Sequence, residues 1–268
     1  VGTPGTTPAT SLVFLQAQQK LNENAAVMSP RYATVNPAAN AALIEGMKGL
    51  FNPVSAISKQ FKNGMFGEGI LGYDELNMSQ SIKQFTTGSR TGTVTVSSTV
   101  TSEGSTTVVL TGLGSTTIKA GDVFTIANVY AVNPQTREST GSLYQFVALA
   151  DVTASTTASV TVPAMYSATQ ALATVDALPV ATAAVTFLGA ASTQYPQNLI
   201  YHRDAITFAT ADLLMPQGVD MASRQVHNGI SLRVVRQYDI NNDRLPCRID
   251  VLYGYSVIRP QMAVRLWG

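Results

Sequence analysis

The sequence has little charge, little histidine and almost no cysteine, and each shortage excludes a class of protein. Only 12% of the 268 residues are charged, and the net charge of +1 provides no basic field to neutralise nucleic-acid phosphates. The single cysteine, Cys247, excludes a disulfide framework within the chain. No apolar run approaches the roughly 20 residues that cross a bilayer, so we expect no membrane partner.

Hydrophobic residues are plentiful, at 45% of the chain, so a sizeable core can be buried. Charged residues make up only 12% of this chain, about half of their share in a typical soluble protein. A free monomer needs charged residues on its surface. We therefore expect neighbouring molecules to cover much of the surface.

Charge and composition divide the chain into three segments. Residues 1–89 and 198–268 resemble each other in charge density, whereas residues 90–197 carry few charges and are rich in Thr, Ser, Val and Ala. This pattern predicts an α+β fold in which the two outer segments belong together and the middle segment is an inserted all-β domain.

The first segment combines helical spacing with one strand. Leu12, Leu15 and Leu21 recur at helical intervals, with Ser11 as the expected N-cap. The pair Asn36-Pro37 is typical of an N-cap followed by the first helical residue. The segment therefore predicts helices at residues 11–27, 37–51 and 53–61, and a strand at residues 73–82.

The middle segment consists of short β-branched runs separated by small turn residues. Strands are predicted at residues 93–100, 106–110, 121–129, 143–150, 158–162 and 183–188. About six strands in about 100 residues are typical of a small barrel or sandwich. Residues 133–141 join two of the strongest strands and contain Arg137 and Glu138, so we expect an exposed projection there.

The last segment alternates apolar and polar residues, which predicts strands at residues 205–212, 230–237 and 247–258. We expect these strands to share a sheet with the strand at 73–82, and Cys247 to be a small buried hydrophobe. The segment has eight arginines, six aspartates and no lysine. Arginine suits geometrically fixed pairs with carboxylates, within or between subunits; the alternative is a solvated face of mixed charge.

Two short motifs imitate ligand sites. Residues 67–72 match the G-x-G-x-x-G spacing of dinucleotide-binding loops, but that motif needs a strand before it and a helix after it, the reverse of the order predicted here. Asp239, Asn241 and Asp243 imitate a calcium loop, yet Arg244 stands where such a loop needs glycine. We therefore predict a glycine-rich turn at the first site and an Asx turn between strands at the second.

Catalytic chemistry has no support in the sequence. The two histidines, His202 and His227, have no second ligand at metal spacing, and no G-x-S-x-G turn presents a nucleophile. We therefore expect no enzyme activity, no metal and no cofactor.

Four long blocks resemble one family, and together they touch all three segments. Residues 36–51, 119–141, 212–224 and 229–266 resemble the coat proteins of short-tailed, P22-type phages. The resemblance implies the Hong Kong 97 capsid fold, with peripheral and axial domains and an inserted β-barrel domain. The family order begins with an N-terminal arm, an extended loop and a long spine helix, so this chain resembles the C-terminal portion of a coat protein.

The resemblance also implies a function and a site. The chain would assemble as pentamers and hexamers of an icosahedral capsid in the host cytoplasm, with scaffolding and portal proteins as partners. The shell of the virion would enclose double-stranded DNA without sequence-specific binding. In that family the projecting loop of the barrel reaches a neighbouring capsomer across a two-fold axis. The matching residues expected to make this inter-subunit contact are Asn133, Pro134, Gln135, Thr136, Arg137, Glu138, Ser139 and Thr140.

Other classes of protein fit less of the sequence. A phage tail or decoration protein with an immunoglobulin-like module would have the same Thr/Val-rich middle, but it would not explain the helices before it or the arginine-rich strands after it. An adhesin would be expected to line a pocket with aromatic residues, which make up only 7% of the chain.

Overall fold

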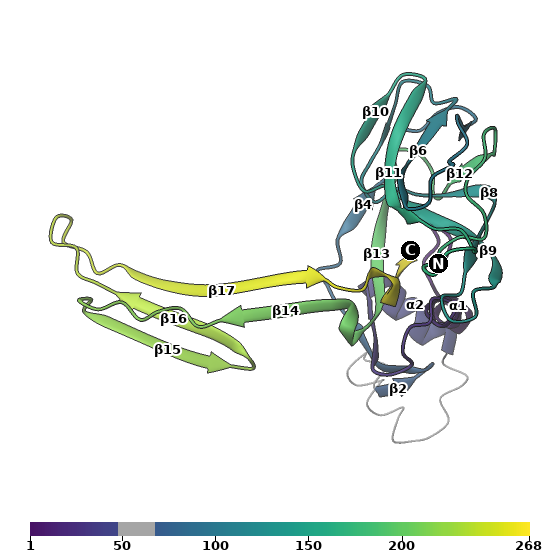
Figure 1. Cartoon of the computed structure of the whole chain (residues 1–268). Coiled ribbons are helices and arrows are strands. Elements are labelled where there is room, and N and C mark those ends of the chain that lie inside the picture. Colours follow the sequence, from purple (N-terminus) through teal and green to yellow (C-terminus); the bar gives the residue numbers. More distant parts are fainter. Residues whose placement is uncertain (48–67) are drawn as a thin grey trace. The chain divides into compact units, whose positions relative to one another are not determined.

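The computed structural model describes residues 1–47 and 68–268, and contacts divide the chain into two compact units (Figure 1). Unit 1 comprises Val1–His202 and Gln261–Gly268, and unit 2 comprises Arg203–Pro260. The described residues are mostly β, with two α-helices. The helix predicted at 53–61 and the end of the helix predicted at 37–51 lie outside the described residues.

One sheet of unit 1 has the order β18-β13-β1-β3-β2, and β4 also pairs with β13; we call it the main sheet. Its strands are β1 (Arg31–Val35), β2 (Glu68–Ile70), β3 (Tyr73–Met78), β4 (Gln84–Thr86), β13 (Gln194–His202) and β18 (Ala263–Trp267). Strands β1 and β3 are parallel, and the chain between them contains a helix, as a parallel pair requires a crossover. Among these strands only β3 matches a strand predicted from the sequence, the one at residues 73–82.

Two helices accompany the main sheet, α1 (Ser11–Glu23) and α2 (Pro37–Met47). The prediction of an Asn36 cap is confirmed, since Asn36 Oδ1 accepts a hydrogen bond of 3.0 Å from the Ala39 N–H. The predicted apolar face of α1 is right only in part: Leu21 is buried, together with Phe14, whereas Leu12 is 60% exposed and Leu15 is also exposed. The cap also differs, because Thr10 and not Ser11 precedes the helix.

The middle of the chain forms eight strands around one core, and we call residues 94–187, which contain this core, the β region. They are β5 (Thr95–Val96), β6 (Ser105–Thr111), β7 (Thr116–Ile118), β8 (Val123–Val132), β9 (Ser139–Val147), β10 (Val152–Ala154), β11 (Thr157–Met165) and β12 (Val185–Phe187). They pair as β11-β6-β5, β12-β8-β9 and β10-β7. All six predicted strands overlap observed ones, whereas the short strands β7 and β10 were missed.

The core of the β region is centred on aromatic rings. Phe124 and Phe146 are fully buried and stacked, with 5.5 Å between ring centroids, and Phe187 lies 5.3 Å from Phe124. The members of this core and the hydrophobic residues packed on it lie between Val94 and Phe187. The β region therefore has a core of its own.

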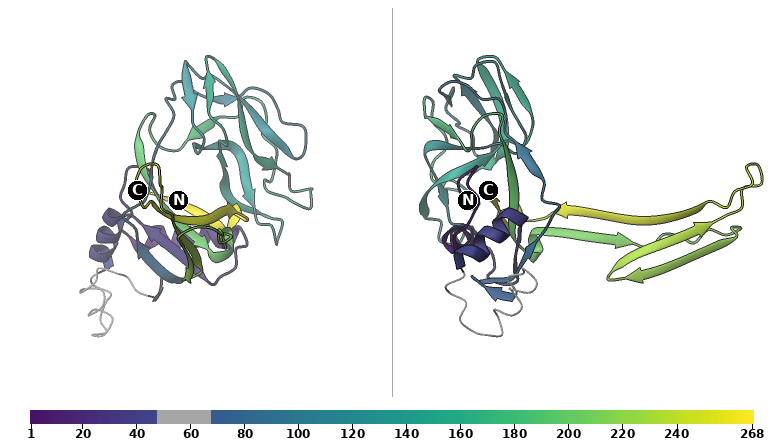
Figure 2. Two further views of the ribbon diagram at one scale, coloured as in Figure 1. Left: turned by 90° about the vertical axis from the view of Figure 1, so that its left-hand side faces the viewer. Right: turned by 180° about the vertical axis from the view of Figure 1, so that it is seen from behind.

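Unit 2 is a single antiparallel sheet with the order β14-β17-β16-β15. Its elements are η1 (Arg203–Ala205), β14 (Ile206–Ala211), β15 (Met221–His227), β16 (Ile230–Arg236) and β17 (Cys247–Val257), and η2 (Pro260–Met262) leads back to unit 1. Figure 2 shows these strands lying side by side. The predicted sheet shared with residues 73–82 is wrong, because β3 pairs with β1 and β2. Alternation identifies a strand but does not identify its partner.

The aromatic core predicts a large loss of stability on truncation. Phe124→Ala should lower the free energy of unfolding by about 3–5 kcal/mol, because the side chain is fully buried. The matched control is Thr161→Ala on the exposed side of β11, which should cost less than about 1 kcal/mol. Denaturant unfolding followed by circular dichroism measures both, and equal losses would contradict this account of the core.

Candidate assembly surfaces

The predicted contact loop is a hairpin tip between β8 and β9 (Figure 1). Asn133 N–H donates to Glu138 O at 3.0 Å, and Asn133 Oδ1 accepts from the Gln135 N–H at 2.9 Å. This Asx turn fixes the tip through the side chain of one residue. Residues 134–139 are exposed, as predicted, while Ser139 and Thr140 already belong to β9.

The two charges of the tip are adjacent and exposed. Arg137 has a φ of 60°, and its N–H donates to Asn133 O at 2.8 Å. A left-handed backbone is uncommon for a residue with a long side chain, so the turn itself holds Arg137 in place. The guanidinium and the Glu138 carboxylate therefore stand on a defined backbone.

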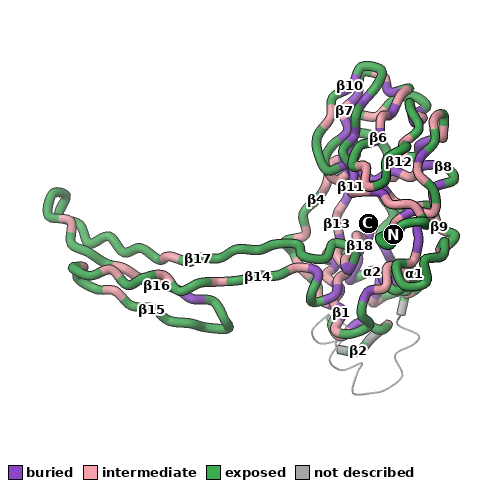
Figure 3. Tube along the Cα trace, viewed as in Figure 1, coloured by how far each residue is buried: buried purple, intermediate pink, exposed green. Residues whose placement is uncertain are grey.

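The sheet of unit 2 has one apolar face. Register places the odd-numbered residues of β17 beside Phe208 and Ile206 on β14 and beside Leu232 and Val234 on β16, and Ile230 lies two residues before Leu232 on the same face. The trace of β17 is almost entirely coloured as exposed (Figure 3), and Tyr255 is 76% exposed. The apolar face consists of Ile206, Phe208, Ile230, Leu232, Ile249, Val251, Tyr253, Tyr255 and Val257. A sheet that exposes such a face has not buried it against a second layer, as stable domains do.

The opposite face of the same sheet carries an ion pair. Arg233 Nη2 lies 2.6 Å from Asp250 Oδ2 on the adjacent strand, and Arg248 Nε lies 2.9 Å from Asp250 Oδ1. The hydrogen bonds from Arg233 lower the pKa of Asp250. The ion pair therefore stabilises the sheet at neutral pH, and this stabilisation is lost as acid protonates the Asp250 carboxylate. The prediction of fixed arginine–aspartate contacts is confirmed within the chain.

The remaining predicted sites hold no clustered chemistry. Asp239 Oδ1 accepts from the Asn241 N–H at 3.1 Å, which confirms an Asx turn. Cys247 is exposed, so its predicted burial is wrong, because β17 lies in a sheet without a covering layer. His202 is buried in β13 and His227 is exposed at the end of β15. In residues 1–47 and 68–268 no three His, Cys, Asp or Glu side chains are grouped to hold a metal ion.

The glycine-rich motif connects strands. Leu71 and Gly72 form the turn between β2 and β3, which pair antiparallel, so a strand follows the motif as predicted. The first glycine, Gly67, and the helix predicted before it lie outside the described residues.

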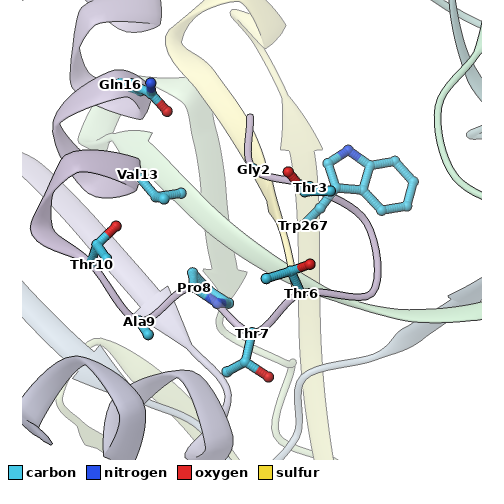
Figure 4. A pocket seen from close by; sticks show the side chains of 10 residues that line it. All are labelled: Gly2, Thr3, Thr6, Thr7, Pro8, Ala9, Thr10, Val13, Gln16 and Trp267. Carbon is cyan, nitrogen blue, oxygen red and sulfur yellow. The ribbon is translucent and has the colours of Figure 1, made fainter. Parts of the chain in front are cut away.

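A pocket of about 340 Å³ lies beside the N-terminal residues of the chain (Figure 4). Its wall contains Val13 and Gln16 of α1 and Trp267 of β18. The rest of the lining consists of Gly2, Thr3, Thr6, Thr7, Pro8, Ala9 and Thr10. No titratable side chain lines this pocket, so it offers no group for acid–base chemistry.

An exposed hairpin and an exposed apolar sheet face are surfaces that can contact other protein molecules. Residues 13–268 match the family model described as "P22 coat protein - gene protein 5". The chain belongs to the P22 coat protein family. It is therefore a structural subunit of the phage capsid and not an enzyme. The family match also decides against the alternative of a tail or decoration protein.

The comparison with solved structures gives a partial match to the "CUS-3 coat protein I-domain". The sequence identity is 28%, the match covers 37% of this chain and 96% of that chain, and the TM-score is 0.29. No curated protein matches the chain. The described helices include none long and apolar enough to cross a membrane.

The apolar face predicts a position-specific effect on assembly. Tyr255→Glu should leave the free subunit folded but reduce shell yield, because burying an unpaired carboxylate at a contact costs several kcal/mol per subunit. The matched control is Ser256→Glu, one residue along β17 on the opposite face. Sedimentation of assembled shells measures both variants. Equal yields would show that the apolar face is not covered in the shell.

Proposed function

We propose that this coat subunit builds an icosahedral shell through the Hong Kong 97 capsid fold. Residues 1–89 and 198–268 would supply the peripheral and axial parts, and residues 90–197 the inserted β-barrel domain. The family match over nearly the whole chain supports this proposal. The observation that carries it is the separate core of the β region, whose buried members span Val94 to Val185.

The hairpin tip is the proposed contact between capsomers. Adjacent opposite charges suit a self-complementary contact across a two-fold axis, where Arg137 of each subunit meets Glu138 of its mate. An exposed pair of this kind contributes at most about 1 kcal/mol, but a shell repeats the contact many times, as in multivalent binding. The exposed position and the fixed backbone of both residues support this role.

The proposed partners follow from the same assembly. Pentamers and hexamers of the coat protein would assemble in the host cytoplasm with scaffolding and portal proteins. The shell would enclose double-stranded DNA without sequence-specific contacts, and the net charge of +1 agrees with a wall that does not neutralise phosphates.

The contact predicts a charge-reversal pattern. Arg137→Glu should weaken assembly or change particle shape, because two carboxylates would then face each other across the axis. Adding Glu138→Arg should restore part of the loss, since the charges are exchanged and no longer alike. Particle yield and shape by electron microscopy, at low and high salt, measure the effect.

A neutral variant separates charge from backbone strain. Arg137→Asn removes the charge but tolerates the left-handed φ at least as well as arginine does. It should stabilise the turn and still weaken assembly, by less than Arg137→Glu does. If all three variants assemble like the parent protein at both salt concentrations, the hairpin is not an assembly contact.

A further inference from the structure

A buried ion pair lies where the chain passes from the main sheet into the β region. Arg90 Nη1 is 2.8 Å from Asp122 Oδ1, and the side chains are 6% and 0% exposed. Asp122 immediately precedes β8, while Arg90 lies just after the chain leaves β4. A buried charge pair is costly unless hydrogen bonds satisfy its remaining atoms, so its other partners decide what it does.

Those partners join three separate segments of chain. The Asp122 carboxylate accepts N–H groups from Gly88 at 3.1 Å and from Lys119 at 2.9 Å. Arg90 Nη2 donates to Leu188 O at 3.3 Å and to Gly189 O at 3.1 Å. The pair therefore binds the incoming chain at 88–90, the turn at 119–122 and the outgoing chain at 188–189.

A second arginine holds the same turn from the main sheet. Arg265 on β18 donates from Nη2 to Gly121 O at 2.8 Å. Its guanidinium lies 4.7 Å from the Trp267 ring centroid and 5.7 Å from that of Phe85, within the range of cation–π attraction. A Cβ at Gly121 would lie 3.1 Å from the Phe85 ring, so the turn and the aromatic side chain are in close contact.

The backbone alone would leave this junction a two-stranded ribbon. Strand β4 pairs with the start of β13, Thr87 N–H donates to Thr193 O at 3.0 Å, and Ser192 N–H donates to Gly88 O at 3.1 Å. Two-stranded ribbons twist more than wider sheets do. Side-chain contacts across the ribbon therefore help to fix its direction. They include the polar bonds above and the apolar packing of Val123 and Leu188 against Phe85, Tyr195 and Trp267.

We propose that Asp122, held by Arg90 and adjoined by Arg265, is a positioning residue that fixes the direction of the β region on the main sheet. Strand β8 begins at Val123 and runs to Val132, next to the hairpin tip. Ten residues of strand span up to about 33 Å. A tilt of about 10° at the base would then move the tip by about 6 Å, about twice the length of a hydrogen bond.

The Arg90–Asp122 pair and the Arg265–Gly121 hydrogen bond, which we together call the clamp, would set where Arg137 and Glu138 meet a neighbour. The clamp therefore deepens the proposed role of the hairpin and rests on it. The effect of the clamp on the direction of the β region can nevertheless be measured in the free subunit. Spin labels at Thr136→Cys on the hairpin and at Gln80→Cys after β3 report the distance between the β region and the main sheet. The exposed Cys247 is replaced by serine in all variants.

Pulsed electron paramagnetic resonance should give one narrow distance distribution for the parent chain. Asp122→Asn should broaden it at least twofold, while amides in the core of the β region stay protected from hydrogen exchange. Asp74→Asn is the matched control, since Asp74 also accepts a backbone N–H, that of Arg31 at 2.7 Å, but lies within the main sheet. It should leave the distribution narrow.

A milder variant covers the case in which Asp122→Asn does not fold. Arg265→Gln removes the cation over the rings but leaves the Arg90–Asp122 pair, and it should also broaden the distribution. An unchanged distribution in a folded variant of either position overturns the clamp. Broad distributions combined with normal shells would leave the clamp standing and contradict the hairpin contact, so the two proposals fail separately.

Discussion

The backbone hydrogen bonds of β13 are the constraint on which the other parts of unit 1 depend. This strand pairs with β4 at its beginning, with β1 at its end and with β18 along most of its length. It follows the β region directly and leads directly into unit 2 at Arg203. Its buried Asn198 also accepts the Asn36 N–H at 2.7 Å, next to the start of α2. A change in β13 would therefore reach the β region, the helices and the C-terminal strand together.

The expectation that neighbouring molecules cover much of the surface has a structural counterpart in unit 2. Its arginine–aspartate contacts include a pair on one face of the sheet, and the other face presents aromatic and aliphatic side chains. Such a sheet has little stability by itself in water, because it lacks a second layer. Membership of the coat protein family accounts for the uncovered apolar face, since a subunit in an assembled shell is in contact with other coat-protein subunits.

Local features of the fold could be predicted because neighbouring residues determine them. Asn36-Pro37 specified the start of α2, β-branched alternation specified most strands of the β region, and the hairpin at 133–138 follows from polar residues between two apolar strands. The Asx turn at Asp239 and the arginine–aspartate contacts were also recognisable, since their residue types fix their chemistry.

Features that depend on distant partners could not be predicted. The sequence of β13 contains Pro196 and polar residues, so no alternation marks it as a central strand. Cys247 and the apolar residues of β17 alternate as in a buried strand, yet no layer of unit 2 covers them. Asp122 was missed because a single aspartate in a turn has no pattern; the only signal is its position directly before a long apolar strand.

The most direct test of this account is a cryo-electron microscopy map of shells assembled from the coat protein, at a resolution that shows side chains. The account predicts that the β8–β9 hairpin of each subunit contacts a neighbouring subunit, with Arg137 close to a partner carboxylate. Hairpins that stand in solvent without a neighbour, in an otherwise well-ordered shell, would contradict it.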